Sequence, residues 1–270
     1  KLRFNNRDAD LYWGEHSASL MLKERVQFYD HFTINARFRP AFFSVLQFVL
    51  TMLAWCPSSK SILGGSLTVL ISFGVMTFIS TFISNLGNMC QKKLFSIWGG
   101  APTTAILRHR DQLLDKYTKQ RYHKWLDGKI DGLNLPKVED ETQDQTDADM
   151  KYQSAINFLR EFTRDKTKYP AVYRDNVAYG FARNLLSIRV MGLLVALMCV
   201  VINLYFVWPV LALAKGEAEG IILSNYLLGL GAGLTSVVFV LAFLLVINNN
   251  FVKERGFRYA KTLLESCEEP

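Results

Sequence analysis

Long apolar blocks without charge alternate with charged segments along this chain. A helix needs about 20 apolar residues to cross the hydrocarbon core of a bilayer, which is about 30 Å thick. Three blocks reach that length, and the first is extended because Arg37 and Arg39 at its start can snorkel toward the membrane surface. The pattern predicts an all-α, polytopic membrane protein with four transmembrane helices. The charge-free blocks cover about residues 41–55, 62–86, 190–214 and 221–247.

The blocks pair into two predicted hairpins on either side of a long polar segment. We expect the first transmembrane hairpin at 40–87 and the second at 190–250. Residues 88–189 between them are predicted to form a basic helical domain. Residues 1–39 mix charges with aromatic rings, as an amphipathic segment at a membrane surface does. Residues 251–270 form a charged tail.

Positive charge predicts the orientation of these spans. Of the 31 Lys and Arg residues, 29 lie in the N-terminal segment, the central domain and the tail, and only Lys60 and Lys215 lie in the two short turns. Segments rich in Lys and Arg stay on the cytoplasmic side of a membrane. We therefore expect both termini and residues 88–189 to be cytoplasmic.

The second block carries an unusual number of polar residues, which recur at steps of three and four. This spacing places them on one face of a helix. The face can pack against another helix, where hydroxyl groups allow close approach, or it can line a pore and face water. The sequence leaves both interpretations open. The candidate pore-lining residues are Thr77, Ser80, Thr81, Ser84 and Asn88.

The central domain is expected to contain two basic clusters separated by an acidic stretch. A helix capped by Thr103 or Thr104 is predicted to run to about Leu126, with a basic face. Residues 139–149 are rich in carboxylates and read as a solvated linker. A further helical pattern at 171–189 continues into the third span without a visible break.

The basic face has two interpretations. It can attract anionic lipid headgroups, or it can bind the phosphates of a nucleotide or short single-stranded DNA, with neighbouring aromatic rings stacking on bases. Arginine suits the second role because its guanidinium group binds phosphate through two hydrogen bonds. The candidate ligand-binding residues are Arg108, Arg110, Arg174, Arg183 and Arg189.

No catalytic or metal-binding pattern is visible in the sequence. The cysteines Cys56, Cys90, Cys199 and Cys267 form no CxxC motif, and the four histidines lack zinc-ligand spacing. No Ser or Cys lies in a nucleophile motif. The four blocks also lack the carboxylates and lysines that coupled transporters use. We expect no enzymatic activity, metal or cofactor.

Two stretches resemble the channel effector of Hailong-type bacterial anti-phage defence. They are WGGAPTTAILRHRD at Trp98–Asp111 and DNVAYGFARNLLSIR at Asp175–Arg189, which together cover about 29 residues. The resemblance implies an oligomeric ion channel. We expect a homo-oligomer, for example a tetramer, in the bacterial inner membrane. The resemblance also implies control by a nucleotide signal, such as a short DNA oligomer, from a partner nucleotidyltransferase. It assigns no site residue.

Two function classes follow. The first is an oligomeric channel that is gated through its cytoplasmic domain, with copies around an axis each contributing one polar stripe. The second is a membrane-anchored interaction or scaffold module without a pore, in which the spans only hold the domain at the bilayer. A third class, an enzyme acting on lipids, has no catalytic constellation to support it.

Overall fold

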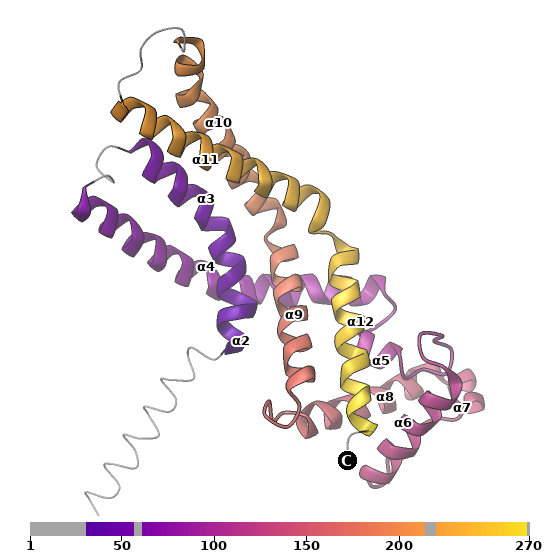
Figure 1. Cartoon of the computed structure of the whole chain (residues 1–270). Coiled ribbons are helices and arrows are strands. Elements are labelled where there is room, and N and C mark those ends of the chain that lie inside the picture. The colour runs from indigo at the N-terminus through magenta and orange to yellow at the C-terminus, as the bar shows by residue number, and fades with distance from the viewer. Residues whose placement is uncertain (1–30, 57–60, 214–219, 269–270) are drawn as a thin grey trace, which may run out of the picture.

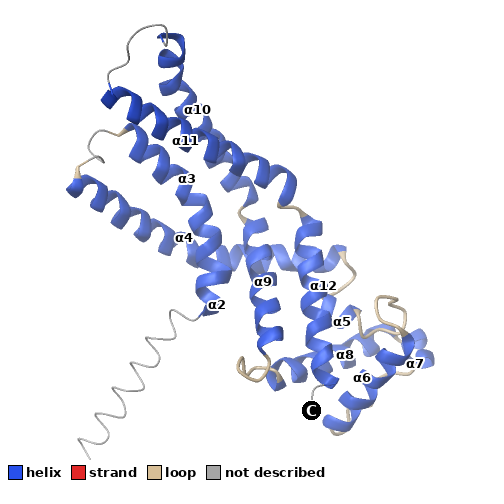
Figure 2. Ribbon diagram, viewed as in Figure 1, coloured by secondary structure: helices blue, strands red, loops and turns tan. Residues whose placement is uncertain are grey.

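The computed structural model describes residues 31–56, 61–213 and 220–268, and these residues form helices and loops without a strand (Figure 1, Figure 2). The predicted all-α class is confirmed for this part of the chain. Most of the predicted amphipathic N-terminal segment, and the turns that contain Lys60 and Lys215, lie outside the described residues.

Four helical segments are long and apolar enough to cross a membrane, as the charge-free blocks predict. They extend beyond those blocks at several ends because flanking polar residues continue the same helices. The segments are Ile34–Trp55, Ile62–Ala105, Arg189–Pro209 and Tyr226–Val246. The helices that build them are η2 (Ile34–Phe38), α3 (Arg39–Trp55), α4 (Ile62–Ile97), α5 (Pro102–Ala105), α10 (Arg189–Leu213), α11 (Gly220–Leu241) and the π-helix η4 (Ala242–Val246).

Helices α3, α10 and α11 pack closely at one end of the molecule (Figure 1). A Cβ atom at Gly229 of α11 would lie 2.0 Å from the ring of Trp55, and one at Gly233 would lie 3.3 Å from Cβ of Asn203. The GxxxG pair therefore makes the close helix contact that its spacing predicts. The indole of Trp55 also donates a 2.8 Å hydrogen bond to the side chain of Asn203.

Helix α4 behaves differently from the other candidate spans. Its most apolar 18-residue stretch contains no buried residue. Farther along, Gly87 meets α9 (Pro170–Ser187), and Leu94 enters the core of the polar end. Helix α4 thus runs without a break from the apolar end of the molecule to the polar end (Figure 1).

The polar end has its own hydrophobic core, to which several helices contribute. Tyr152, Ile156 and Leu159 are fully buried there, together with Leu263 and Leu264. The helices are α6 (Lys116–Lys129), α8 (Gln145–Phe162), α9 and α12 (Asn249–Glu265), and the short helix α7 (Val138–Gln143) precedes α8. The remaining short elements are α2 (His31–Thr33) and η5 (Ser266–Glu268). The predicted charged tail is therefore largely a helix that packs against α9 and α5.

The predicted single helix from Thr103 to Leu126 is wrong. The structure has the short helix α5, a non-helical segment at 106–115, and then α6, whose first turn is capped by Asp115. The break is stabilised by Lys119, whose ammonium group donates to the backbone carbonyls of Arg108 and Asp111 at 2.6 Å each. A continuous helix would use those carbonyls internally.

The acidic segment at 139–149 is not the linker that was predicted, because it forms α7 and the start of α8. Most of its residues are exposed to solvent as predicted, but Glu141 is buried. Its carboxylates have specific partners: Asp144 caps α8 by accepting from two backbone N–H groups, and Asp147 pairs with Lys151 at 2.8 Å. Charge composition alone does not show such partners.

The helix before the third span does not continue into it, contrary to the prediction. Helix α9 ends at Ser187, Ile188 leaves helical geometry, and α10 begins at Arg189. A second break lies opposite, where Ile247 adopts an extended conformation between η4 and α12. The guanidinium group of Arg189, at the start of α10, donates to backbone carbonyls of Phe243 and Leu244 in η4, shortly before the second break.

Candidate functional site

The predicted pore-lining residues of α4 fall into two groups. Thr77, Thr81 and Asn88 are exposed, and Ser84 is half-buried. Ser80 is only 6% exposed and donates to the carbonyl of Thr77 at 2.7 Å, so it faces the interior of the chain. Including Ser80 in the stripe was therefore wrong.

Helix α4 presents three faces around its axis. At about 100° per residue, Thr77, Thr81, Ser84 and Asn88 lie within about 60° of each other. The buried face, which includes Ser80, Ile83 and Gly87, is centred about 100° to one side of this polar stripe. The rings of Phe78 and Phe82, whose centroids are 4.8 Å apart and whose planes are tilted by 57°, lie about 110° to the other side. In the single chain, the polar stripe thus lies outside the buried face of α4.

The threonine hydroxyls of the stripe are partly satisfied by their own helix. Thr77 donates to the carbonyl of Phe73 at 2.8 Å, and Thr81 donates to that of Thr77 at 3.3 Å. Such bonds lower the cost of placing a hydroxyl against lipid. The stripe can therefore face lipid as well as water.

The five candidate arginines are not brought together. Arg108 and Arg110 lie side by side in the 106–115 segment. Arg174 is exposed and pairs with Asp175 of its own helix at 3.2 Å. Arg189 donates to the backbone carbonyls of Phe243 at 2.8 Å and Leu244 at 3.1 Å, and Arg183 lies between α9 and α4.

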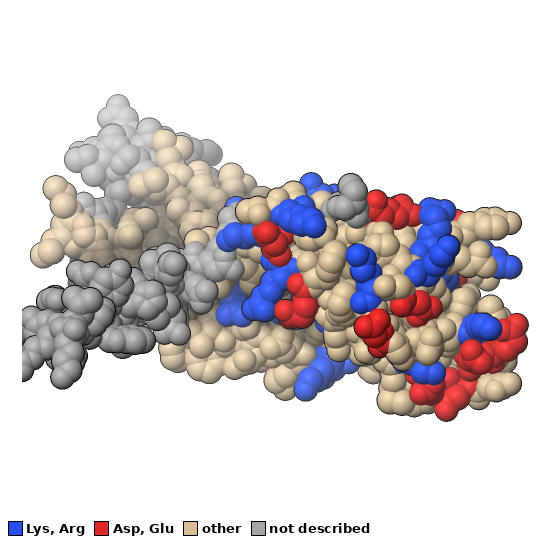
Figure 3. Space-filling view, turned by 90° about the horizontal axis from the view of Figure 1, so that it is seen from below, with Lys and Arg blue, Asp and Glu red and all other residues tan. Residues whose placement is uncertain are grey.

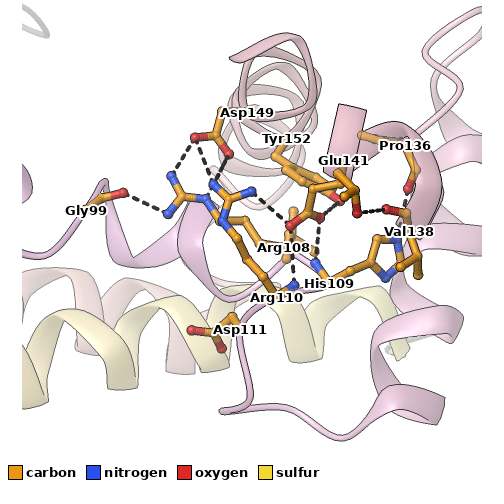
Figure 4. Close-up of polar contacts among 12 residues, drawn as sticks. Gly99, Arg108, His109, Arg110, Asp111, Pro136, Val138, Glu141, Asp149 and Tyr152 are labelled. Carbon is orange, nitrogen blue, oxygen red and sulfur yellow. Dashed lines mark hydrogen bonds and ion pairs between the residues drawn. The ribbon is translucent and has the colours of Figure 1, made fainter. Parts of the chain in front are cut away.

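Arg108 and Arg110 bind the acidic segment that was predicted to be solvated (Figure 4). Arg108 makes two hydrogen bonds to the carboxylate of Asp149, at 2.8 and 2.7 Å, and a third to the carbonyl of Gly99. Arg110 reaches Asp149 at 3.2 Å and Glu141 at 2.9 Å. Two carboxylates thus neutralise the two guanidinium groups, so these arginines are not free phosphate ligands.

Glu141 is the centre of this network. Its carboxylate accepts from the backbone N–H groups of His109 and Arg110, from the guanidinium of Arg110, and from the hydroxyl of Tyr152 at 2.7 Å (Figure 4). Burial raises the pKa of Glu141, but these four hydrogen bonds outweigh it, and the pKa lies below its usual value. The carboxylate is therefore ionised at neutral pH and holds the 106–115 segment on α7 and α8.

The 106–115 segment separates two open pockets, and Arg110 and Asp111 line both. The first pocket, of about 550 Å³, lies toward α6 and α7 and includes Lys116 and Lys119. The second, of about 530 Å³, lies toward α12 and includes Trp98, Lys253 and Phe257.

The second pocket combines aromatic rings with positive charge. Trp98 and Phe257 contribute rings whose centroids are 6.4 Å apart, and the ammonium group of Lys253 lies 5.7 Å from the ring of Phe257. Sequence reasoning missed Lys253 and Phe257 because it treated their segment as a tail. Their spacing of four residues, which places a cation beside a ring on one helix face, was the available signal.

Charge at the polar end is mixed rather than uniformly basic. Basic and acidic side chains are interspersed on the face seen from below (Figure 3). The second pocket itself is lined by Arg108, Arg110 and Lys253 but also by Asp111 and Glu254. Among the described residues, no group of three or more His, Cys, Asp or Glu side chains could hold a metal ion. Binding of an anionic ligand here would therefore depend on individual hydrogen bonds and ion pairs rather than on a positive electrostatic potential over the whole surface.

Comparisons of this chain with protein-family models, curated proteins and solved structures gave no match.

Proposed function

We propose that this protein is an oligomeric, channel-like membrane effector whose conducting path is lined by α4. The observation that carries the proposal is the polar stripe of Thr77, Thr81, Ser84 and Asn88, which lies outside the buried face of a candidate membrane span. One chain cannot enclose a path with a single stripe. Several copies around an axis, for example four, can each direct one stripe inward and surround it with polar groups.

The three faces of α4 suit such a ring. A helix that lines an axis has neighbours on both sides of its inward face. The packed face of α4 joins it to α3 of the same chain. The phenylalanine face then lies between the inward face and the next copy or lipid. Two hairpins, 40–87 and 190–250, would provide this arrangement.

The proposed orientation places residues 88–189 and both termini in the cytoplasm of a bacterial cell. Its basis is that 29 of the 31 basic residues lie in the N-terminal segment, the central domain and the tail, and only two lie in the short turns. We expect single cysteines introduced at Lys60 and Lys215, in a background lacking the four native cysteines, to react with an impermeant maleimide in intact cells. A cysteine at exposed Lys129 is the cytoplasmic control and should react only after lysis. Protection of either turn in intact cells would contradict the orientation.

Gating is proposed to start at the second pocket. The rings of Trp98 and Phe257 can stack on a base, and Lys253 and Arg110 can approach a phosphate. The ligand we propose is a nucleotide or short single-stranded DNA supplied by a partner nucleotidyltransferase in anti-phage defence. A phosphate that draws Arg110 away from Asp149 would change the energy of the network around Glu141. Such differential binding is what allows a ligand to shift a conformational equilibrium.

The pocket is mechanically linked to α4. Trp98 is the residue at which α4 ends, and it packs against the core of the polar end. Helix α4 continues from there into the apolar end as one element. The other two connections are interrupted at Ile188 and Ile247, so we expect a movement at Trp98 to be transmitted mainly along the continuous helix α4.

A membrane-anchored scaffold is the second candidate function. It is favoured by the hydrogen bonds of Thr77 and Thr81 to carbonyls of their own helix, which allow the stripe to face lipid. In this case the pocket would bind a partner without opening a path.

Ion flux in liposomes separates the two functions. We expect the purified protein to release a trapped ion or a pH gradient, and we expect a short single-stranded DNA to change that flux. The change should be lost in Lys253→Gln and retained in Lys261→Gln, a matched change on the exposed side of α12. An absence of flux from correctly inserted, assembled protein, with and without the oligonucleotide, would favour the scaffold.

A further inference from the structure

Arg183 lies where three helices cross, close to the ends of the candidate spans. A Cβ atom at Gly87 of α4 would lie 3.3 Å from Nε of Arg183 and 2.0 Å from the side-chain oxygen of Asn184. Asn184 in turn donates from its amide to the carbonyl of Ala36 in η2 at 2.7 Å. Nε of Arg183 therefore lies beside α4, and the neighbouring Asn184 links α9 to η2.

The positive charge of Arg183 has no negative partner among the described residues. None of the ion pairs in this part of the chain includes it. Its Nη1 donates to the side-chain oxygen of Gln91, which is neutral, and its Nε is buried without a hydrogen-bond partner. Leaving a buried guanidinium nitrogen without an acceptor is costly, because the hydration lost on burial is not replaced.

The surroundings of Arg183 add positive charge and a further unused donor. The hydroxyl of Tyr179, one helical turn earlier, is also buried without a partner. Burial is the main cause that lowers the pKa of Arg183, and the nearby charge of Arg37 lowers it further. Arg37 belongs to η2, so the two cations come from different elements.

This environment distinguishes Arg183 from the other candidate arginines. Arg108 and Arg110 are neutralised by carboxylates, Arg174 pairs with Asp175, and Arg189 binds backbone carbonyls. Of these five, only Arg183 is partly buried and has neither a carboxylate nor a backbone carbonyl as acceptor in the described part of the chain; its one acceptor is the neutral side chain of Gln91. A missing anion accounts for both observations.

We propose that Arg183, together with Tyr179 and Arg37, binds a phosphate-bearing anion. Phosphate oxygens accept charge-assisted hydrogen bonds from a guanidinium group and an ordinary one from a phenol. The site lies near the starts of two candidate spans, at Ile34 and Arg189. That position suits the headgroup phosphate of an anionic lipid, and a free phosphate compound could reach it from the water side. The site does not depend on whether the protein conducts ions.

A bound anion would hold three elements together. Arg183 belongs to α9, Gln91 to α4 and Arg37 to η2. Helices α4 and η2 are parts of candidate spans, and α9 ends just before the span that begins at Arg189. Occupancy would therefore stabilise the crossing of α4 and α9. Loss of the anion would leave two cations close together and loosen it.

The test compares ligands and variants of the full-length protein. We expect delipidated protein in detergent to be stabilised in a saturable way by phosphatidylglycerol or by inorganic phosphate, as a rise in Tm, and native mass spectrometry to detect the bound species. Arg183→Gln should weaken this binding about tenfold or more, because one charge-assisted interaction is lost. Arg174→Gln, which removes the same charge from the exposed side of α9, should bind like the parent.

The outcomes also identify the source of the phosphate. Stabilisation by phosphatidylglycerol but not by phosphatidylcholine or inorganic phosphate indicates an anionic lipid. Stabilisation by inorganic phosphate but not by either lipid indicates a free phosphate compound. If Arg183→Gln does not fold, Arg183→Lys and Tyr179→Phe replace it, and both should bind more weakly than the parent. Parent protein that binds neither ligand saturably, or folded Arg183 variants that bind as the parent does, would overturn the proposal.

Discussion

Replacing Thr81 with Phe is expected to remove most of the ion flux of the assembled protein. Thr81 is exposed in the middle of the polar stripe of α4, and its hydroxyl makes only a 3.3 Å bond to the carbonyl of Thr77. The change should therefore leave the fold of each chain intact. If copies direct the stripe to a common axis, a ring of phenyl groups would narrow the path and exclude water from it, with a loss of flux on the order of tenfold or more.

The matched control is Leu204→Phe on α10. Leu204 is also exposed on a candidate span, but it belongs to a helix without a polar stripe. Flux per inserted oligomer should be measured in liposomes for both variants, after chromatography has shown that each assembles like the parent. Parent-like flux from assembled Thr81→Phe would mean that another helix lines the path.

Replacing Glu141 with Ala is expected to cause the largest loss of stability in the polar end. The carboxylate, whose side chain is 4% exposed, accepts from two backbone N–H groups, from Arg110 and from Tyr152. Its removal leaves several buried donors without partners, which costs about 3–5 kcal/mol for a buried, paired charge. The 106–115 segment should detach from α7 and α8, so hydrogen exchange should accelerate there and in α8.

Glu139→Ala provides the control for this change. Glu139 is exposed on the same short helix, and its removal should alter stability by no more than about 0.5 kcal/mol. Thermal unfolding in detergent would compare the two variants. Equal Tm values for Glu141→Ala and Glu139→Ala would show that the network does not stabilise the domain.

The effect of Glu141 should also depend on pH. Its pKa is lower in the folded protein than in the unfolded chain. A carboxylate of this kind contributes stability that is fully present above its unfolded pKa, about 4.3, and is lost as the pH falls through the folded value. The difference in Tm between the parent and Glu141→Gln should therefore be constant near neutral pH and shrink below about pH 4.

These two tests address separate parts of the proposed mechanism. Thr81 tests the path, and Glu141 tests the network that would respond to a ligand at the second pocket. The two sites are joined by α4, which ends at Trp98 beside that pocket. A Glu141 variant that alters flux without altering assembly would therefore support transmission along α4.

Local sequence patterns predicted the features that depend on one helix at a time. Runs of apolar residues located the four candidate spans, because length and hydropathy are properties of the segment itself. The spacing of Thr77, Thr81, Ser84 and Asn88 predicted a polar face for the same reason. The GxxxG pair predicted a close contact because a missing side chain always leaves space, although its partners Trp55 and Asn203 were not predictable.

Charged residues were predicted less well, because their role depends on partners that are distant along the chain. The sequence predicted Arg108 and Arg110 as free ligands and the acidic stretch as a solvated linker, and the fold pairs the two across about 40 residues. Ser80 was misplaced for the same reason: the three- and four-residue spacing of polar residues does not show which face of a helix packs against its neighbours.

The sequence by itself therefore determined the helical class, the candidate spans and the polar stripe of α4. Only the tertiary structure decided which charges are neutralised, where α9 separates from α10, and that the half-buried Arg183 has no counter-ion among the described residues. The physical reason is that helix periodicity arises from backbone geometry shared by all helices. The energy of a charge, in contrast, depends on burial and on atoms supplied by other elements, such as Gly87 and Asn184 around Arg183.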